Sequence, residues 1–278
     1  MHGRGWHFAR LAAPVAELPS ISIVTPCLNA AATIEEALAS VRAQGYPRLE
    51  HLVVDGGSSD GTVELLERAP GVRFVSEPDR GRAHAVNKGV AMTSGEVIGW
   101  LNADDRYEPG ALVAVGGELA RNPAAMWVTG FCRIVDADGA EIRGPITSYK
   151  NLLLRHWSYP LHLTQNFVAD PATFVRRVAL EQAGPLEERY AISHDYDLWL
   201  RVGVRHEPVV LERTLASFRM TEGTASMEGF ERQFREHAEV ARRHGVGHPL
   251  PVLINRVMSR LIVMVYRALR LARRLRPA

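Results

Sequence analysis

Between residues 20 and 130, short runs of β-branched residues alternate with segments whose apolar residues recur at helical spacing. This rhythm is typical of βαβ units, which build a largely parallel sheet with helices packed on its faces. We therefore expect an open α/β sheet from this half of the chain. The runs that predict strands cover residues 21–25, 51–55, 72–76, 97–102 and 126–130.

The second half of the chain breaks this rhythm. Asp136-Ala-Asp-Gly139 lies between apolar stretches and predicts a hairpin turn. Residues 145–170 are aromatic, contain prolines and read as irregular, whereas residues 172–175 predict a returning strand and residues 178–183 a helix. Antiparallel pieces thus join the parallel ones, so we expect a mixed sheet.

Length favours a single core with an appended segment, because 278 residues are many for one small domain and few for two. We expect residues 20–228 to form one α/β domain. Its first half, 20–130, should bind the ligand, and its second half, 131–228, should complete the site. Residues 1–19 predict a flexible N-terminal arm, and residues 229–278 predict a C-terminal helical extension.

Composition excludes several classes of protein. The hydrophobic fraction is 46%, the charged fraction is 23% and the formal net charge is +2, as in an ordinary soluble protein. These values argue against disorder and against a nucleic-acid partner held by bulk charge. Cys27 and Cys132 lack metal-ligand spacing and are too few for a disulfide framework, which favours a reducing, cytoplasmic location.

Polar residues gather where the predicted parallel strands end. Ligands of open α/β sheets bind beyond the carboxyl ends of the strands, so these residues should line one crevice. Taken singly, each could equally serve the turns that loops need. They are Thr25, Pro26, Asn29, Asp55, Glu77, Asp79, Asn102, Asp104 and Asp105.

The segment Asp55-Gly-Gly-Ser-Ser-Asp-Gly-Thr62 follows a predicted buried strand. Its glycines let the backbone approach a ligand closely, and the Asp55 carboxylate could accept a hydrogen bond from a uracil-like base. Asp60 is better placed to cap the next helix. The sequence contains no G-x-G-x-x-G and no G-x-x-x-x-G-K-[ST], so a dinucleotide fold and a P-loop are unsupported.

Asp104 and Asp105 are adjacent carboxylates at the end of a predicted strand. Two like charges this close are costly unless a cation lies between them. Hard oxygen ligands suit Mg²⁺ or Mn²⁺, which could bridge a diphosphate and neutralise charge on a phosphate leaving group. We therefore predict a divalent metal at this pair.

The order of these motifs resembles that of the family 2 glycosyltransferases. The resemblance extends over residues 20–220, and the series at this spacing is far more specific than any single motif. It implies a GT-A fold, a nucleotide-sugar donor, a divalent metal and inversion at the anomeric carbon. The motifs are Ile21-Ser-Ile-Val-Thr-Pro26 with Asn29, Val53-Val-Asp-Gly-Gly-Ser-Ser-Asp-Gly-Thr62, Glu77-Pro-Asp-Arg-Gly81 with Asn87-Lys-Gly89, and Asn102-Ala-Asp-Asp105.

The resemblance also implies roles for the matched positions. Asp55 corresponds to the base-binding aspartate, and Asp104 and Asp105 to the metal and diphosphate contacts. The resemblance places Arg219, in Phe218-Arg-Met-Thr-Glu-Gly-Thr-Ala-Ser226, on a loop that closes over the diphosphate; a solvated surface arginine is the alternative. The remaining positions expected to line the donor site are Thr25, Pro26, Asn29, Asp79, Arg80, Lys88, Asn102 and Ala103.

Family members carry a Glu-Asp pair whose aspartate is the catalytic base, and the matching stretch here begins at Ser193-His-Asp-Tyr-Asp197. His194 replaces the glutamate. Inversion by direct displacement needs a carboxylate that takes the acceptor hydroxyl proton, so Asp195 is our candidate base and Asp197 the second choice. The alternative is that Asp195 merely caps the following helix.

The C-terminal segment predicts an amphipathic helix over residues 252–275. Its arginines form a stripe beside an apolar face, which is typical of a helix lying on an anionic membrane surface. Packing on the domain core or on a homodimer partner is the alternative. The late apolar run 261–266 is too short to span a bilayer. The arginines are Arg256, Arg260, Arg267, Arg270 and Arg274.

From these observations we expect an inverting glycosyltransferase that uses a nucleoside-diphosphate sugar, with UDP-sugars favoured. The acceptor would be a saccharide or a lipid-linked molecule in bacterial surface polysaccharide or glycolipid assembly. One alternative is a sugar-phosphate nucleotidylyltransferase, although Thr25-Pro-Cys-Leu-Asn29 lacks the Gly-rich basic loop that such an enzyme needs. A degenerate nucleotide-sugar binding protein is the other.

Overall fold

The computed structural model describes residues 17–221 and 229–274, and the side chains up to residue 268. Within these ranges the strands form one nine-stranded mixed sheet, in the order β3-β2-β1-β4-β8-β6-β9-β5 with β7 paired to β6. The parallel part, β1 (Ile21–Cys27), β2 (Leu49–Asp55), β3 (Arg73–Ser76) and β4 (Val97–Trp100), follows the predicted strands closely. All seven residues of β1 are buried, as expected for a central strand.

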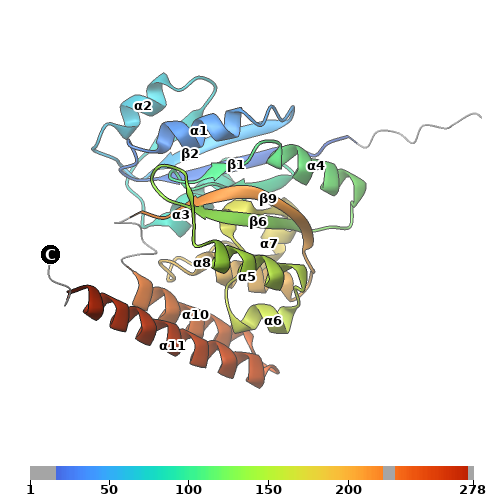
Figure 1. Ribbon diagram of the computed structural model, residues 1–278. Coiled ribbons are helices and arrows are strands. Elements are labelled where there is room, and N and C mark those ends of the chain that lie inside the picture. The colour runs from blue at the N-terminus through green and yellow to red at the C-terminus, as the bar shows by residue number, and fades with distance from the viewer. Residues whose placement is uncertain (1–16, 222–228, 275–278) are drawn as a thin grey trace, which may run out of the picture.

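Helices cover both faces of the sheet (Figure 1). Apolar side chains of α1 (Ile34–Arg42) and α4 (Ala111–Arg121) pack on one face with Ile21 and Ile23, while α2 (Thr62–Arg68) packs beside α1. Side chains of α3 (Arg82–Ala91), α7 (Arg177–Ala183) and α8 (His194–Gly203) pack on the other face with Val24. Alternate residues of β1 therefore face two different layers.

The second half supplies antiparallel pairings, as the sequence predicted. Next to β4 lies β8 (Thr173–Arg176), which runs antiparallel to both β4 and β6 (Trp127–Val135). Asp136 to Gly139 form the predicted turn into β7 (Glu141–Ile142). Two strands were not predicted: β9 (Val209–Arg219) and the short β5 (Arg106–Tyr107).

The stretch 145–170 is not irregular, which corrects the expectation. It contains α5 (Gly144–Arg155), α6 (Tyr159–Thr164) and the start of the short helix η1 (Asp170–Ala172). Prolines in these helices lie in the first turn, where the missing N–H costs nothing because it would have no helical partner. The prolines thus mark helix starts and not breaks.

Three tryptophans fix α8 against the sheet. The Trp199 ring stacks on Trp100 of β4, with ring centroids 5.0 Å apart, and on Trp127 of β6, with centroids 5.6 Å apart. All three side chains are fully buried. Offset stacking of buried rings adds about 0.5–1.5 kcal/mol per pair beyond the burial of area. The helix that begins at His194 is therefore rigidly placed over the sheet.

The C-terminal segment forms a hairpin of two helices, α10 (Phe230–His244) and α11 (Pro249–Arg274), which lies beyond α5, α6 and α8 from the sheet (Figure 1). By length and composition alone, Pro249–Ala268 is apolar enough to cross a membrane, and 11% of its most apolar window is buried. The prediction that this segment is too short to span a bilayer considered residues 261–266 alone, whereas the apolar stretch extends over Pro249–Ala268. The predicted N-terminal arm, 1–19, lies almost wholly outside the described residues.

Candidate active site

The ends of the parallel strands meet as expected, but not every predicted side chain reaches that edge. Cys27 pairs with Asp55 and Asp55 with Ser76, so β1, β2 and β3 end side by side. Thr25 and Pro26 are buried within β1, and the Thr25 hydroxyl lies 2.9 Å from His51 Nε2. Both side chains are buried, so any ligand contact here would come from the backbone.

Asp55 organises the loop that follows β2. Its carboxylate accepts hydrogen bonds from the Gly57 and Ser58 N–H groups, at 3.1 and 2.9 Å, and from the Ser76 and Ser58 hydroxyls. Burial acts to raise the pKa of Asp55, but the bonds from Ser58, Ser76 and Gly57 outweigh it and lower the pKa. Asp55 is therefore ionised and holds a tight backbone turn at the sheet edge.

Asn29 connects this loop to the end of β1. Its Oδ1 accepts from the Ser59 N–H at 2.9 Å, and its own N–H donates to the Ser58 hydroxyl at 2.7 Å. Asn29 has a φ of 50°, a left-handed conformation that asparagine tolerates better than most residues. Asp60 accepts from the N–H groups of Thr62 and Ala31, but the N-cap of α2 is Gly61, so the predicted capping role of Asp60 is wrong.

Asp79 approaches the same loop from the end of β3. A Cβ at Gly56 would lie 2.7 Å from Asp79 Oδ2, so a side chain at position 56 would displace the carboxylate. The flanking basic residues are paired, Arg80 with Glu188 at 2.8 Å and Lys88 with Glu77 at 2.7 Å. The structure thus brings Asp79, Asp55 and Asn29 together at the loop that follows β2, while Arg80 and Lys88 are each paired with a glutamate.

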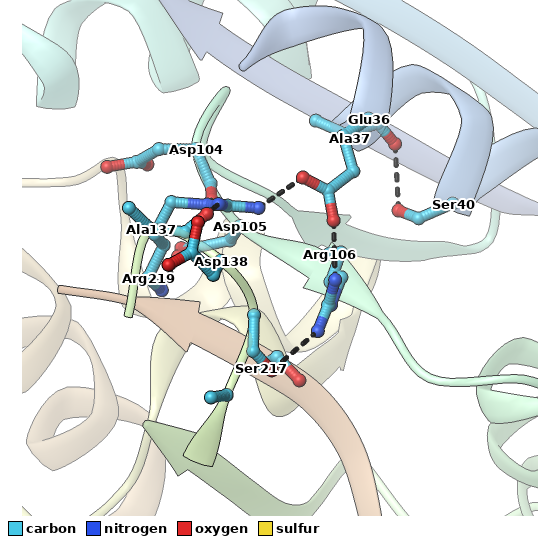
Figure 2. A network of polar contacts seen from close by, with 12 residues as sticks. Glu36, Ala37, Ser40, Asp104, Asp105, Arg106, Ala137, Asp138, Ser217 and Arg219 are labelled. Atoms are coloured by element: carbon cyan, nitrogen blue, oxygen red, sulfur yellow. Dashed lines mark hydrogen bonds and ion pairs between the residues drawn. The ribbon is translucent and has the colours of Figure 1, made fainter. Parts of the chain in front are cut away.

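Asp104 and Asp105 differ in environment. Asp105 is 2% exposed, and its two oxygens accept from the Arg219 N–H at 2.9 Å and from Asn102 Nδ2 at 2.8 Å. The Asp104 carboxylate has no hydrogen-bond partner among the described residues and points away from the Glu36–Arg219 pair (Figure 2). Burial raises the pKa of both carboxyls, and the charge of Asp104 adds to the rise at Asp105. Ala103, between Asn102 and this pair, is buried.

The residues present fit a divalent cation held mainly by Asp104. Among the described residues, no group of three or more His, Cys, Asp or Glu side chains could enclose a metal by itself. Asp105 has both oxygens engaged, which leaves the Asp104 oxygens as the available hard ligands. Mg²⁺ or Mn²⁺ sites of this kind complete their shell with substrate phosphates and water.

Arg219 lies behind the Asp104–Asp105 turn. Its Nε donates to the Asp104 carbonyl at 3.0 Å, and the guanidinium also contacts the Ala137 carbonyl and the Glu36 carboxylate (Figure 2). Glu36 in turn pairs with Arg106 at 2.5 Å. Glu36 lies in the first turn of α1. The N-cap residue of this helix, Thr33, makes no side-chain capping hydrogen bond. The contacts of Arg219 and Glu36 therefore hold the Asp104–Asp105 turn in place.

Asp195 has the environment of a general base. It lies in the first turn of α8 and is 9% exposed. Asn166 donates to one carboxylate oxygen at 3.0 Å, while the other has no hydrogen-bond partner in the described chain. Burial and then the charge of Asp170 raise the pKa of Asp195 to about 7. The N-cap of α8 is Ser193, so the alternative capping role for Asp195 is wrong.

Asp197 and His194 have structural surroundings. Asp197 is fully buried, with one oxygen 2.8 Å from Arg201 Nε and the other 2.8 Å from His244 Nε2. His194 is 1% exposed with neither ring nitrogen hydrogen-bonded in the described residues, and burial lowers its pKa to about 3. His194 is therefore neutral at physiological pH.

Asp170 and Arg82 belong to the site but were not predicted. The charge of Asp170 raises the pKa of both Asp105 and Asp195, and that of Arg82 lowers the pKa of Asp104, Asp170 and Asp195. Asp170 begins η1 just before β8, and no local pattern distinguishes it from a turn residue. Arg82 directly follows the motif Glu77–Gly81, which is the one signal that could have marked it.

Comparison with known proteins agrees with this geometry. The model of glycosyl transferase family 2 matches residues 22–180. An uncharacterized glycosyltransferase of Mycobacterium tuberculosis, MT1564, is 32% identical over 73% of this chain and 76% of its own length. The O-antigen biosynthesis protein RfbC of Myxococcus xanthus is 33% identical over 66% of this chain, which spans 14% of that protein.

Two solved structures share the fold. Mannosyltransferase PcManGT from Pyrobaculum calidifontis, in complex with GDP-Man and Mn²⁺, superposes with a TM-score of 0.64 at 18% identity over 92% of this chain and 81% of its own. S. aureus TarS 1–349, in complex with UDP-GlcNAc, gives a TM-score of 0.59 at 16% identity over 80% and 66%. The chain is a member of glycosyl transferase family 2, with the GT-A-type mixed sheet that its motifs predicted.

Proposed function

We propose that this glycosyltransferase moves a sugar from a nucleoside-diphosphate donor to a hydroxyl group by direct displacement, with inversion and with Asp195 as the base. The observation that carries the proposal is the unpaired, buried oxygen of Asp195, whose pKa of about 7 suits proton transfer at neutral pH. The charge of Asp170 raises the pKa of both Asp195 and Asp105, which supports the proposal that the base and the metal-binding turn act in one site.

The donor nucleotide would bind at the loop where Asn29, Asp55 and Asp79 come together. The Asp55 carboxylate is fully buried with both oxygens engaged, so it would act by shaping the turn rather than by contacting the base as first expected. The backbone groups of this turn, beside the Asp79 carboxylate, can hydrogen-bond a pyrimidine base at the sheet edge. We favour a UDP-sugar, a preference supported by the likeness to TarS, whose complex contains UDP-GlcNAc. A GDP-sugar is the second candidate, since PcManGT was solved with GDP-Man.

Asp104 would hold the divalent cation, with Asp105 fixing the turn behind it. The cation would neutralise the negative charge that develops on the leaving diphosphate. Arg219 would hold this turn in place through its hydrogen bonds to the Asp104 carbonyl and the Asp105 carboxylate, rather than contact the phosphate as first expected. The nucleotidylyltransferase and binding-protein alternatives find no support in the comparisons.

The acceptor would be a saccharide or a lipid-linked molecule, as in the assembly pathway after which RfbC is named. We infer that the enzyme works at the cytoplasmic surface of a membrane, to which α11 binds peripherally. Its outward side chains support this: Leu253, Val257, Leu261 and Met264 are 48–57% exposed, and Arg256 and Arg260 are exposed beside them. Such a face suits an anionic bilayer surface.

The donor site is tested by thermal shift with UDP, GDP, dTDP and CMP, each with and without Mn²⁺. A ligand that binds only the native state raises its Tm, so one nucleotide should stabilise the protein in an Mn²⁺-dependent way. Asp104→Ala should abolish the Mn²⁺-dependent part and leave the Tm of the unliganded protein nearly unchanged. The absence of any shift in the wild-type protein would contradict the proposal.

A further inference from the structure

Glu236 of α10 holds the backbone that leads into α8. The Glu236 side chain is 7% exposed, and its carboxylate accepts hydrogen bonds from three consecutive N–H groups, those of Ala191, Ile192 and Ser193, at 3.1, 3.0 and 3.0 Å. These residues precede His194, the first residue of α8. A side chain from the C-terminal hairpin thus fixes the segment from which the Asp195 helix starts.

The charge of Glu236 suits this position. The N-terminus of a helix carries partial positive charge and unsatisfied N–H groups, so a carboxylate there is stabilising. Burial acts to raise the pKa of Glu236, but hydrogen bonds from Ile192, Arg232 and Ser193 lower it. Arg232, one turn earlier, donates to the same carboxylate at 2.8 Å. The Glu236 carboxylate is therefore ionised at neutral pH.

Two further contacts join the hairpin to the residues that flank Asp195. Asp197 Oδ1 lies 2.8 Å from Nε2 of His244, the last residue of α10. Asn255 of α11 donates to the Leu163 carbonyl at 3.1 Å, and the Tyr196 hydroxyl donates to the same carbonyl at 3.0 Å. The residues directly after Asp195 are thus fixed by the hairpin or share its hydrogen-bond partners.

The Asp195 carboxylate is held directly by one protein contact, the 3.0 Å bond from Asn166, as far as the described residues go. Its position therefore depends on how α8 begins. A misplacement of about 1 Å can lower a rate about a hundredfold when a base must reach a reacting proton. An anchor at residues 191–193 is well placed to prevent such a shift.

We infer that Glu236 is a positioning residue for glycosyl transfer, which holds residues 191–193 so that the first turn of α8 presents Asp195 to the acceptor hydroxyl. The inference rests on the proposed role of Asp195 as the base. It makes the α10–α11 hairpin part of the catalytic apparatus, because the hairpin supplies the anchor from a segment more than 40 residues further along the chain.

The test compares Glu236→Gln and Glu236→Asp with the wild-type enzyme, with Glu239→Gln as the matched control. Glu239 is exposed on α10, and its charge acts on Arg189 and Tyr190, whereas the N–H groups of residues 191–193 bond Glu236. Turnover is measured as release of the nucleoside diphosphate from the donor found by thermal shift. We expect kcat of Glu236→Gln to fall at least tenfold, with KM for the donor within twofold, and Glu239→Gln to match wild type.

The pH profile distinguishes positioning from a merely structural role. Asp195 faces Asp170 of η1, Arg82 of α3, Lys150 of α5 and Asn166. In Glu236→Gln, loosening of the first turn of α8 would admit water to the Asp195 carboxylate and lower its pKa. The acidic limb of the kcat–pH profile should therefore move to a lower pH than in wild type. Glu236→Asp, which keeps the charge on a shorter side chain, should recover part of both effects. The inference would be overturned if Glu236→Gln kept a kcat per folded molecule within twofold of wild type and the acidic limb of its pH profile stayed at the wild-type position.

Two controls keep the outcomes separate. If Asp195→Asn retains wild-type turnover, the proposed base is wrong; if it is inactive while Glu236→Gln is normal, only the positioning role fails. Should Glu236→Gln not fold, hydrogen exchange on folded Glu236→Asp replaces it. The amides of residues 191–193 should then exchange at least tenfold faster than in wild type, and unchanged exchange would count against the anchor.

Discussion

His244 Nε2 lies 2.8 Å from Asp197 Oδ1, and this contact joins the end of α10 to the first turn of the helix that carries the proposed base. Asp197 also pairs with Arg201, so both of its oxygens are engaged in a fully buried position. Asp195, two residues earlier, keeps one oxygen without a partner in the described chain. Two aspartates of one motif thus have different surroundings, which fit the structural role that we propose for Asp197 and the chemical role that we propose for Asp195.

We predict that Asp197→Asn lowers stability and leaves chemistry nearly intact. Breaking a buried ion pair costs about 3–5 kcal/mol, because the remaining partner stays unpaired. Although burial acts to raise the pKa of Asp197, His244 and Arg201 lower it below 3.8, so this stabilisation is present at neutral pH and lost as the pH falls below about 4. Urea unfolding at pH 7 and pH 3 measures the loss, which should be larger at pH 7. A variant that is stable but inactive would contradict the assignment.

The pKa of Asp195 predicts the pH dependence of turnover. A general base must be ionised, and burial with the charge of Asp170 raises this pKa to about 7. The rate should therefore increase tenfold per pH unit below about 7 and level off above it. Nucleoside diphosphate release from saturating donor with Mn²⁺, followed between pH 5 and 9, checks this. A flat profile from pH 5 upwards would mean that a group with an ordinary carboxyl pKa is the base.

The variant Arg219→Lys tests whether Arg219 holds the Asp104–Asp105 turn in place or binds a phosphate. A lysine cannot reach the Asp104 carbonyl, the Ala137 carbonyl and Glu36 together, so the unliganded protein should lose about 1–3 kcal/mol and about 5 °C in Tm. Arg213→Lys, at an exposed position of the same strand, is the control and should change Tm little. An unchanged Tm combined with weaker nucleotide binding would instead favour the phosphate contact.

Binding of α11 to membranes is checked by co-sedimentation with vesicles. The wild-type protein should pellet with vesicles that contain anionic phosphatidylglycerol, less with neutral phosphatidylcholine, and less at high salt. Leu253→Ser combined with Leu261→Ser should reduce binding at least tenfold. Val246→Ser is the control, since Val246 is 87% exposed but precedes the helix. A double variant that alters oligomeric state without altering vesicle binding would indicate a dimer face.

The parallel half of the fold could be predicted because its signals are local. The strands β1 and β4 are short, fully buried runs, and β2 ends in four buried residues. Polar residues at or just after these ends, Asn29, Asp55 and Asn102, mark the turns. In β9 the signal is disrupted: Leu211 pairs with Gly130 but Thr214 with Phe131, so Glu212 and Arg213 form an irregularity at which both side chains are exposed. Two charged residues in the middle of a strand hide its alternation, and only pairing with the distant β6 establishes it.

The same distinction holds for the candidate site. Asp55, Asp104 and Asp195 follow strands or begin a helix within motifs that can be read along the chain. Asp170 and Glu236 act through tertiary contacts with segments more than 20 residues away, and no spacing rule connects them to those segments. The proposed base and metal positions can therefore be read from the sequence, whereas the groups that surround and hold them cannot.

The central claim is tested most directly by comparing wild-type enzyme and Asp195→Asn in donor turnover and donor binding. With Mn²⁺ and the preferred nucleotide-sugar, the account predicts that Asp195→Asn lowers release of the nucleoside diphosphate by about 10²–10⁴-fold. Calorimetric affinity for the Mn²⁺–nucleotide complex should stay within threefold of wild type. Turnover by Asp195→Asn at the wild-type rate would contradict the account, because no other unpaired carboxylate is placed on α8 among the described residues to accept the proton.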